Sequence, residues 1–166
     1  MPSPLLLASI LIAHDLSVAL PIDANRLCIL QPAANALFDP VARAKPTGPL
    51  TLPGGIEGLV TVTGKPGEQH SVEKTRRFRP SFRLTWHGLP VAFLQVRSIF
   101  VPESEGLSEV GIGLAVPLDR LDATLRAAGH PVARAPEYTR VELEPYDGAA
   151  QIERRDDAAF FSCVIG

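Results

Sequence analysis

The sequence predicts an α+β protein with few helices and a sheet that is mixed or antiparallel. Segments with the two-residue alternation of strands outnumber the single clear helical segment. The 16 Pro and 13 Gly among 166 residues favour short elements and many turns. Between residues 110 and 154 the expected elements follow the order β-α-β-β-β, and the chain length fits one domain spanning residues 1–166.

The first half of the chain, residues 1–98, is expected to be irregular and rich in strands. Arg26–Leu30 has the apolar character of a short strand. Pro and Gly alternate so often through residues 31–70 that we expect loops there, with one strand at Gly58–Thr63. A loop in this segment could present a binding surface.

A hairpin is expected next, because apolar and polar residues alternate over residues 82–86 and again from Pro90 to Val101. The pair His87-Gly88 between them is a two-residue turn signal.

The half from residue 110 onward contains the helix. Pro117 suits a helix start, Leu118–Ala128 carries one apolar stripe, and Gly129 is a stop signal. Tyr146-Asp147-Gly148 is expected to form a turn. The expected strands are Val110–Val116, Pro131–Ala135, Tyr138–Glu144, Ala149–Arg154 and Ala158–Ile165.

Composition says little about partners. A hydrophobic fraction of 46% and a net charge of −2 exclude disorder and argue against nucleic-acid binding. The apolar run Leu5–Ala13 has signal-peptide length, but no Lys or Arg precedes it, and it is too short to cross a bilayer. We therefore expect a cytoplasmic protein with no membrane contact, a secreted protein being the alternative. Cys28 and Cys163 could form one disulfide, but two cysteines do not make a disulfide framework, so we expect free thiols in the core.

No complete catalytic or metal motif occurs in the sequence. The four His residues are isolated, with no H-x-x-x-H pair, and G-x-S-x-G is absent. The segment Gly64-Lys65-Pro66-Gly67 lacks the other residues of a phosphate loop and is expected to be a turn.

The densest cluster of positive charge could bind an anion, a protein partner or a nucleic-acid backbone through guanidinium groups. A solvated strand edge is the alternative explanation. The cluster consists of Lys74, Arg76, Arg77, Arg79 and Arg83, interleaved with Phe78 and Phe82.

A second candidate surface is one face of the strand from Pro90 to Val101. Gln95 and Arg97 alternate there with apolar residues, as on the wall of a pocket that has a few polar groups. Together with Arg83 and Trp86 they are the predicted ligand-binding residues. An exposed sheet face would give the same pattern.

The second half resembles the βαβββ module of the vicinal oxygen chelate superfamily, which includes glyoxalases, bleomycin-resistance proteins and extradiol dioxygenases. Three segments carry the resemblance: Val110–Val116, the helix from Leu118 to Gly129 followed by Pro131-Val132, and the stretch from Val141 to Glu153. The resemblance implies a second module, a curved sheet around a pocket, and either no cofactor or one divalent metal ion. Glu153, by its implied fourth-strand position, and His14 are the implied metal ligands.

Three functions follow as hypotheses. The first is a small-molecule-binding protein, or an enzyme of the lyase or isomerase type, as the resemblance implies. The second is a non-catalytic protein that binds a partner protein as an inhibitor, immunity protein or adaptor. The third is an RNA-binding or RNA-processing domain that uses residues 74–83. A homodimer fits the first two equally.

Overall fold

The computed structural model describes residues 15–28, 32–67, 71–100, 108–143 and 146–165, and His14 and the apolar run Leu5–Ala13 lie outside these ranges. Within them the chain forms three helices and nine strands. The helices are α2 (Ala24–Cys28), α3 (Pro32–Arg43) and α4 (Leu118–Ala127). The strands are β1 (Gly48–Leu52), β2 (Ile56–Pro66), β3 (Val72–Pro80), β4 (Thr85–Trp86), β5 (Leu89–Phe100), β6 (Ser108–Leu114), β7 (Thr139–Leu143), β8 (Tyr146–Arg155) and β9 (Ala158–Ile165). The predicted α+β class with few helices is confirmed.

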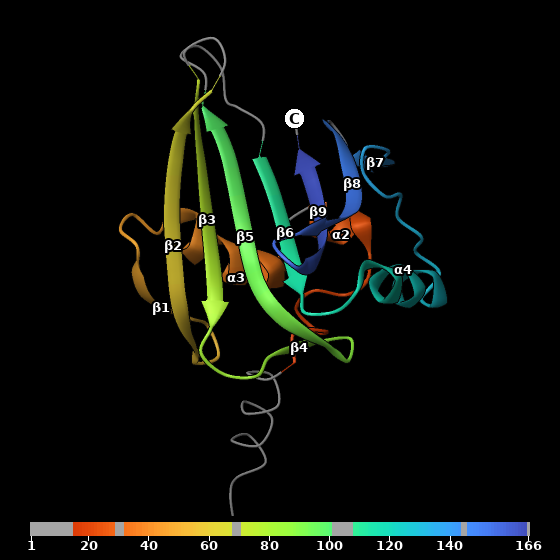
Figure 1. Cartoon of the computed structure of the whole chain (residues 1–166), viewed down its shortest axis with the longest axis horizontal. Helices are drawn as coiled ribbons and strands as arrows, with labels where there is room; N and C mark the ends of the chain where they lie inside the picture. Colours follow the sequence, from red (N-terminus) through yellow and green to blue (C-terminus); the bar gives the residue numbers. More distant parts are fainter. Residues whose placement is uncertain (1–14, 29–31, 68–70, 101–107, 144–145, 166) are drawn as a thin grey trace, which may run out of the picture.

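All nine strands join one curved sheet whose ladders are antiparallel (Figure 1). Its order is β1-β2-β3-β5-β6-β9-β8-β7, with the short β4 paired to β5. The sheet has two halves, β1-β2-β3-β5 and β7-β8-β9-β6, each written from the sheet edge to the centre. In each half, three strands that are consecutive in the chain lie outside one central strand. The central strand β5 follows its three neighbours in the chain, whereas β6 precedes its own. The two halves therefore mirror each other in space and differ in chain order.

Helices cover one face of the sheet. α3 packs on β5 and β3, α2 packs on β7 and β9, and α4 packs on β8 and β9. The side chains between the layers form the main core, which includes Phe38, Phe78, Leu94, Ile112 and Phe161. Figure 1 shows α2 and α3 behind the sheet, and no described helix lies on the face toward the viewer.

In residues 31–70 the strand predicted at Gly58–Thr63 is confirmed, because it lies within β2, but the prediction of loops around it is wrong. Residues 32–43 form α3, and β2 extends over 11 residues. Pro32 occupies the first turn of α3, where a missing N–H costs nothing, and the helix also accommodates Pro40 in its interior. Ala34, Leu37, Phe38 and Val41 have helical spacing and are buried. The strand expected at Arg26–Leu30 is also wrong, because residues 24–28 form α2.

The hairpin prediction is confirmed. His87 and Gly88 connect β4 to β5, and both have a positive φ, of 48° and 76°, as the tightest hairpin turn requires.

The second half follows the order β6-α4-β7-β8-β9. The strand predicted near residue 110 and the helix after Pro117 are confirmed. Pro131–Ala135 is not a strand, since it contributes one isolated bridge, between Arg134 and Ile152. The turn predicted at residues 146–148 is wrong, because these residues begin β8 and Tyr146 pairs with Leu143.

The expectation of free thiols is also wrong. Cys28, at the end of α2, forms a disulfide with Cys163 in β9, with a Cα–Cα distance of 5.4 Å. The two residues are buried, as predicted, and 135 positions apart in the chain. The bond therefore fastens the first described helix to the centre of the second half of the sheet.

Candidate functional site

The candidate site lies on the face of the sheet that the helices leave uncovered. Side chains alternate between faces along a strand, so odd-numbered residues of β3 and β5 share this face. Asp156, in the turn after β8, contacts Arg77 of β3 across β5, β6 and β9. In a flat sheet β3 and β9 would be about 14 Å apart. The contact therefore shows that the sheet curves toward this face, where Figure 1 shows the β8–β9 turn in front of β6.

Two phenylalanines form the apolar floor of this face. Phe93 and Phe160 are buried, with ring centroids 5.7 Å apart, in a small cluster separate from the main core. The guanidinium groups of Arg77 and Arg155 lie 3.9 and 4.1 Å from the centres of the two rings. These cation–π contacts cover the rings and hold the arginines close to the sheet.

The glycines of β6 make room for these rings. A Cβ at Gly111 would overlap the ring of Phe160 and lie 2.8 Å from the carbonyl oxygen of Phe161, and a Cβ at Gly113 would lie 2.5 Å from the Phe93 ring. We expect Gly111→Ala to lower the free energy of unfolding by about 1–3 kcal/mol, because the added methyl group overpacks the floor. Urea unfolding checks this value.

Gly48→Ala is the matched control for that variant, since a Cβ on this strand residue meets open space. Its free energy of unfolding should stay within about 0.5 kcal/mol of the wild type. Equal stability of the two variants would contradict the packing argument.

A chain of alternating charges crosses the same face from β2 to β8. Glu109 of β6 is its centre, with a side chain only 4% exposed. Its Oε1 accepts a 2.9 Å hydrogen bond from Nη1 of Arg155, and its Oε2 lies 3.4 Å from Nη2 of Arg97. The chain consists of Lys65, Glu73, Arg97, Glu109, Arg155 and Glu153. Each charged side chain of this chain thus lies next to one of opposite sign on the curved face of the sheet.

A groove of about 400 Å³ opens beside this chain of charges, over β2 and β3. Polar side chains predominate among its lining residues: Thr61, Thr63, Gly64, Lys65, Glu73, Thr75, Arg77, Arg79 and Asp156. Three of them are cationic and two are anionic. This volume falls within the usual range for sites that hold a small organic molecule.

Arg77 is fixed in the groove wall by Gln95, which is buried. The Oε1 atom of Gln95 accepts hydrogen bonds of 2.9 Å from Nε and 2.7 Å from Nη2 of Arg77. The remaining nitrogen, Nη1, donates to Oδ2 of Asp156 at 2.5 Å. This hydrogen bond and the positive charge of Arg77 hold the pKa of Asp156 below its ordinary value.

The lowered pKa of Asp156 predicts a pH dependence of stability. The unfolded chain binds the proton more tightly, so the Arg77 contact stabilises the fold above about pH 4 and is lost as the pH falls through the folded-state pKa. Relative to Asp156→Asn, wild type should therefore gain stability as the pH rises through about 4. Urea unfolding at several pH values checks this, and parallel profiles for the two proteins would contradict it.

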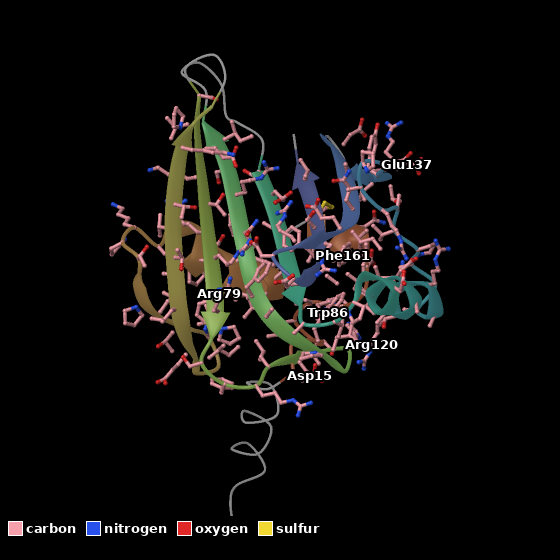
Figure 2. The ribbon with its side chains drawn as sticks, in the orientation of Figure 1. Asp15, Arg79, Trp86, Arg120, Glu137 and Phe161 are labelled. Carbon is pink, nitrogen blue, oxygen red and sulfur yellow. A yellow bond between two sulfur atoms is a disulfide. The ribbon has the colours of Figure 1, made fainter. Side chains whose placement is uncertain are left out.

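Arg79 has no acid partner among the described residues. It is exposed on β3 (Figure 2). Its guanidinium lies 5.5 Å from the centre of the Phe93 ring. Asp156, whose pKa the positive charge of Arg79 also helps to lower, is hydrogen-bonded to Arg77. A negative charge in the groove would therefore find an arginine that no hydrogen bond or ion pair of the described chain engages.

The structure brings together some of the predicted site residues and separates others. Gln95, Arg97, Arg77 and Arg79 lie on the uncovered face, with Glu153 at its far side. Trp86 lies in the main core instead, fully buried, with its indole N–H donating to the carbonyl of Leu20 at 2.5 Å. Figure 2 labels Trp86 near Phe161, whose ring centroid is 5.9 Å away. Arg83 is exposed between β3 and β4.

The predicted basic cluster is divided between the two faces of β3. Arg76 points to the helix-covered face, where its Nε donates to the carbonyl of Ala44 at 2.6 Å. Lys74 alternates with it on that side, whereas Arg77 and Arg79 line the groove. β3 is paired on both sides, so it is not a sheet edge. Lys74, Arg76, Arg77 and Arg79 thus do not form one continuous basic face on β3.

The residues around Glu153 do not fit a metal ion. Its carboxylate contacts the guanidinium of Arg155, and it lies on β8, the third strand of its segment, because residues 131–135 form no strand. In the described ranges no three His, Cys, Asp or Glu side chains come together. A divalent ion needs at least three such ligands. His14 lies outside those ranges.

Sequence reasoning missed the threonines of the groove, the acid Glu109 and the turn residue Asp156. Strand alternation from Arg77 and Arg79 would have placed Glu73 and Thr75 on the same face. No local signal marks Asp156, since its contact with Arg77 depends on the curvature of the whole sheet.

Comparison of the chain with protein-family models, with curated proteins and with solved structures finds no match. None of the described helices has the length and apolar character that crossing a bilayer requires.

Proposed function

We propose that this chain binds a small organic molecule carrying a negatively charged group, in the groove over β2 and β3. The observation that carries the proposal is the pair Arg77 and Arg79, of which Arg79 has no acid partner in the described chain. Guanidinium groups bind carboxylate and phosphate oxygens through charge-assisted hydrogen bonds. The threonine side chains beside them offer hydroxyl groups for the neutral part of the ligand.

Binding, without catalysis, is the activity that the groove supports best. Its two acids are engaged: Asp156 by Arg77, and Glu73 by Arg97 at 3.7 Å and Lys65 at 3.9 Å. Arg77 lowers the pKa of Asp156, and a carboxylate whose pKa is lowered is a poor general base. A lyase or isomerase reaction would need a general base, and both acids of the groove are engaged by cations.

The fold supports the same proposal through the resemblance to vicinal oxygen chelate proteins. The segment from β6 to β9 runs β-α-β-β-β, and the other half of the sheet mirrors its arrangement in space with a different chain order. Two modules that share a curved sheet would be expected to hold a ligand on the face toward which the sheet curves. This relationship is part of the proposal.

Isothermal titration calorimetry with succinate and inorganic phosphate tests the proposal. Arg79→Gln should weaken anion binding about tenfold or more, the value of one charge-assisted hydrogen bond. Arg120→Gln is the matched control, because Arg120 is exposed on α4, away from Arg79 (Figure 2). Equal loss in both variants would mean that binding depends on net charge alone and would contradict the groove as its site.

A partner-binding function is the second candidate, supported by Leu59. This residue is 58% exposed on β2, two positions before the groove residue Thr61, and gives the groove an apolar border. Protein interfaces combine such an apolar contact with arginines. If neither anion binds, this function becomes the better supported one.

We also propose that the chain works in an oxidising compartment, the secreted alternative considered above. The support is the buried disulfide between Cys28 and Cys163, since reducing compartments keep most thiols unpaired. Mass spectrometry of the alkylated protein, purified without reductant, should find no free thiol. Two alkylated cysteines would contradict this proposal.

A further inference from the structure

Asp156 occupies the position on Arg77 that the anionic group of a ligand would take. Gln95 engages Nε and Nη2 of Arg77, so Nη1 is the nitrogen left for another partner. The structure places a carboxylate oxygen there, 2.5 Å away. Because Gln95 is buried and fixes the guanidinium, the orientation of Arg77 does not depend on Asp156.

The contact between Asp156 and Arg77 is open to exchange. The Asp156 side chain is 64% exposed, and ion pairs this exposed contribute little to stability. Asp156 and Asp157 form a tight turn with positive φ values of 48° and 62°, a conformation that Asp tolerates better than most residues. The turn can therefore keep its shape while the Asp156 side chain rotates away from Arg77.

Resting on the proposed function, we propose that the ligand carries a carboxylate and that Asp156 is its built-in competitor. In the empty groove Asp156 occupies Arg77. A bound carboxylate receives its hydrogen bonds from Arg79 and Arg77, and displaces Asp156 from Nη1. We choose a carboxylate as the ligand group because the Asp156 side chain, itself a carboxylate, fits the geometry around Arg77.

The test compares succinate binding to the wild-type protein, Asp156→Asn and Asp157→Asn by isothermal titration calorimetry. Asp157 is the matched control, because it belongs to the same turn but pairs with Arg154 at 3.0 Å and does not line the groove. Both variants remove one negative charge from the turn. We expect Asp156→Asn to bind succinate about two- to fivefold more tightly than wild type, the value of one exposed ion pair. Asp157→Asn should bind as wild type does.

The outcomes separate the inference from the proposed function. Succinate binding that Asp156→Asn leaves unchanged or weakens would overturn the competitor and leave the groove standing. Equal tightening in both variants would assign the effect to net charge and would also overturn it. Binding of inorganic phosphate without succinate would overturn the carboxylate assignment. Absence of binding to all three proteins would contradict the proposed function itself.

Discussion

Replacing both Cys28 and Cys163 by Ala is expected to lower the free energy of unfolding by about 5 kcal/mol. The disulfide joins residues 135 positions apart, and closing a loop of this length removes much of the conformational entropy of the unfolded chain. Such a loss is a large part of the stability of a domain. Urea unfolding followed by fluorescence measures it, because Trp86 is the single Trp of the sequence and is fully buried.

Reduction of the wild-type protein provides the control for this prediction. Wild type in excess reductant should unfold at the same urea concentration as the double variant, and the variant should be insensitive to reductant. A loss below about 1 kcal/mol would mean that the packing of α2 on β9 holds this region without the covalent bond.

Glu109→Ala is expected to lower the free energy of unfolding by about 3–5 kcal/mol. The Glu109 side chain is 4% exposed and lies between Arg97 and Arg155 at the centre of the sheet. Removing the Glu109 carboxylate takes one negative partner away from the half-buried guanidinium groups of Arg97 and Arg155. Leaving a buried charge without its partner is among the most destabilising effects of a substitution. Urea unfolding at pH 7 measures the effect.

Glu57→Ala is the matched control, since Glu57 is an exposed carboxylate on β2. Its effect should stay within about 0.5 kcal/mol. A Glu109 variant as stable as the Glu57 variant would show that the alternating chain of charges does not stabilise the sheet.

Local sequence signals predicted the elements whose formation depends on neighbouring residues. Pro117, the apolar stripe of the helix and Gly129 identified α4, and His87-Gly88 identified the β4–β5 turn. The apolar residues of α3 have the same helical spacing, but the prolines around them favour loops. Packing overrides the low helix propensity of proline in α3, because Leu37 and Phe38 are buried against the sheet.

Sequence predicted the candidate site only in part. Alternation along β5 correctly placed Gln95 and Arg97 on one face of the sheet. The same alternation puts the adjacent residues Arg76 and Arg77 of β3 on opposite faces, so the predicted basic cluster is divided. The groove itself results from contacts between distant segments, such as Asp156 with Arg77, 79 positions apart. The disulfide was missed for the same reason, since separation along the chain carries no information on distance in space.

The most direct test of the central claim is an NMR titration of the threonine methyl groups with succinate. Thr61, Thr63 and Thr75 line the groove, whereas Thr124 on α4 and Thr139 on β7 lie elsewhere and serve as internal controls. The proposed function predicts saturable shifts of the three groove signals, unchanged control signals, and loss of the response in Arg79→Gln. Groove signals that stay unchanged at saturating succinate, or shifts that are equal at all five threonines, would contradict it.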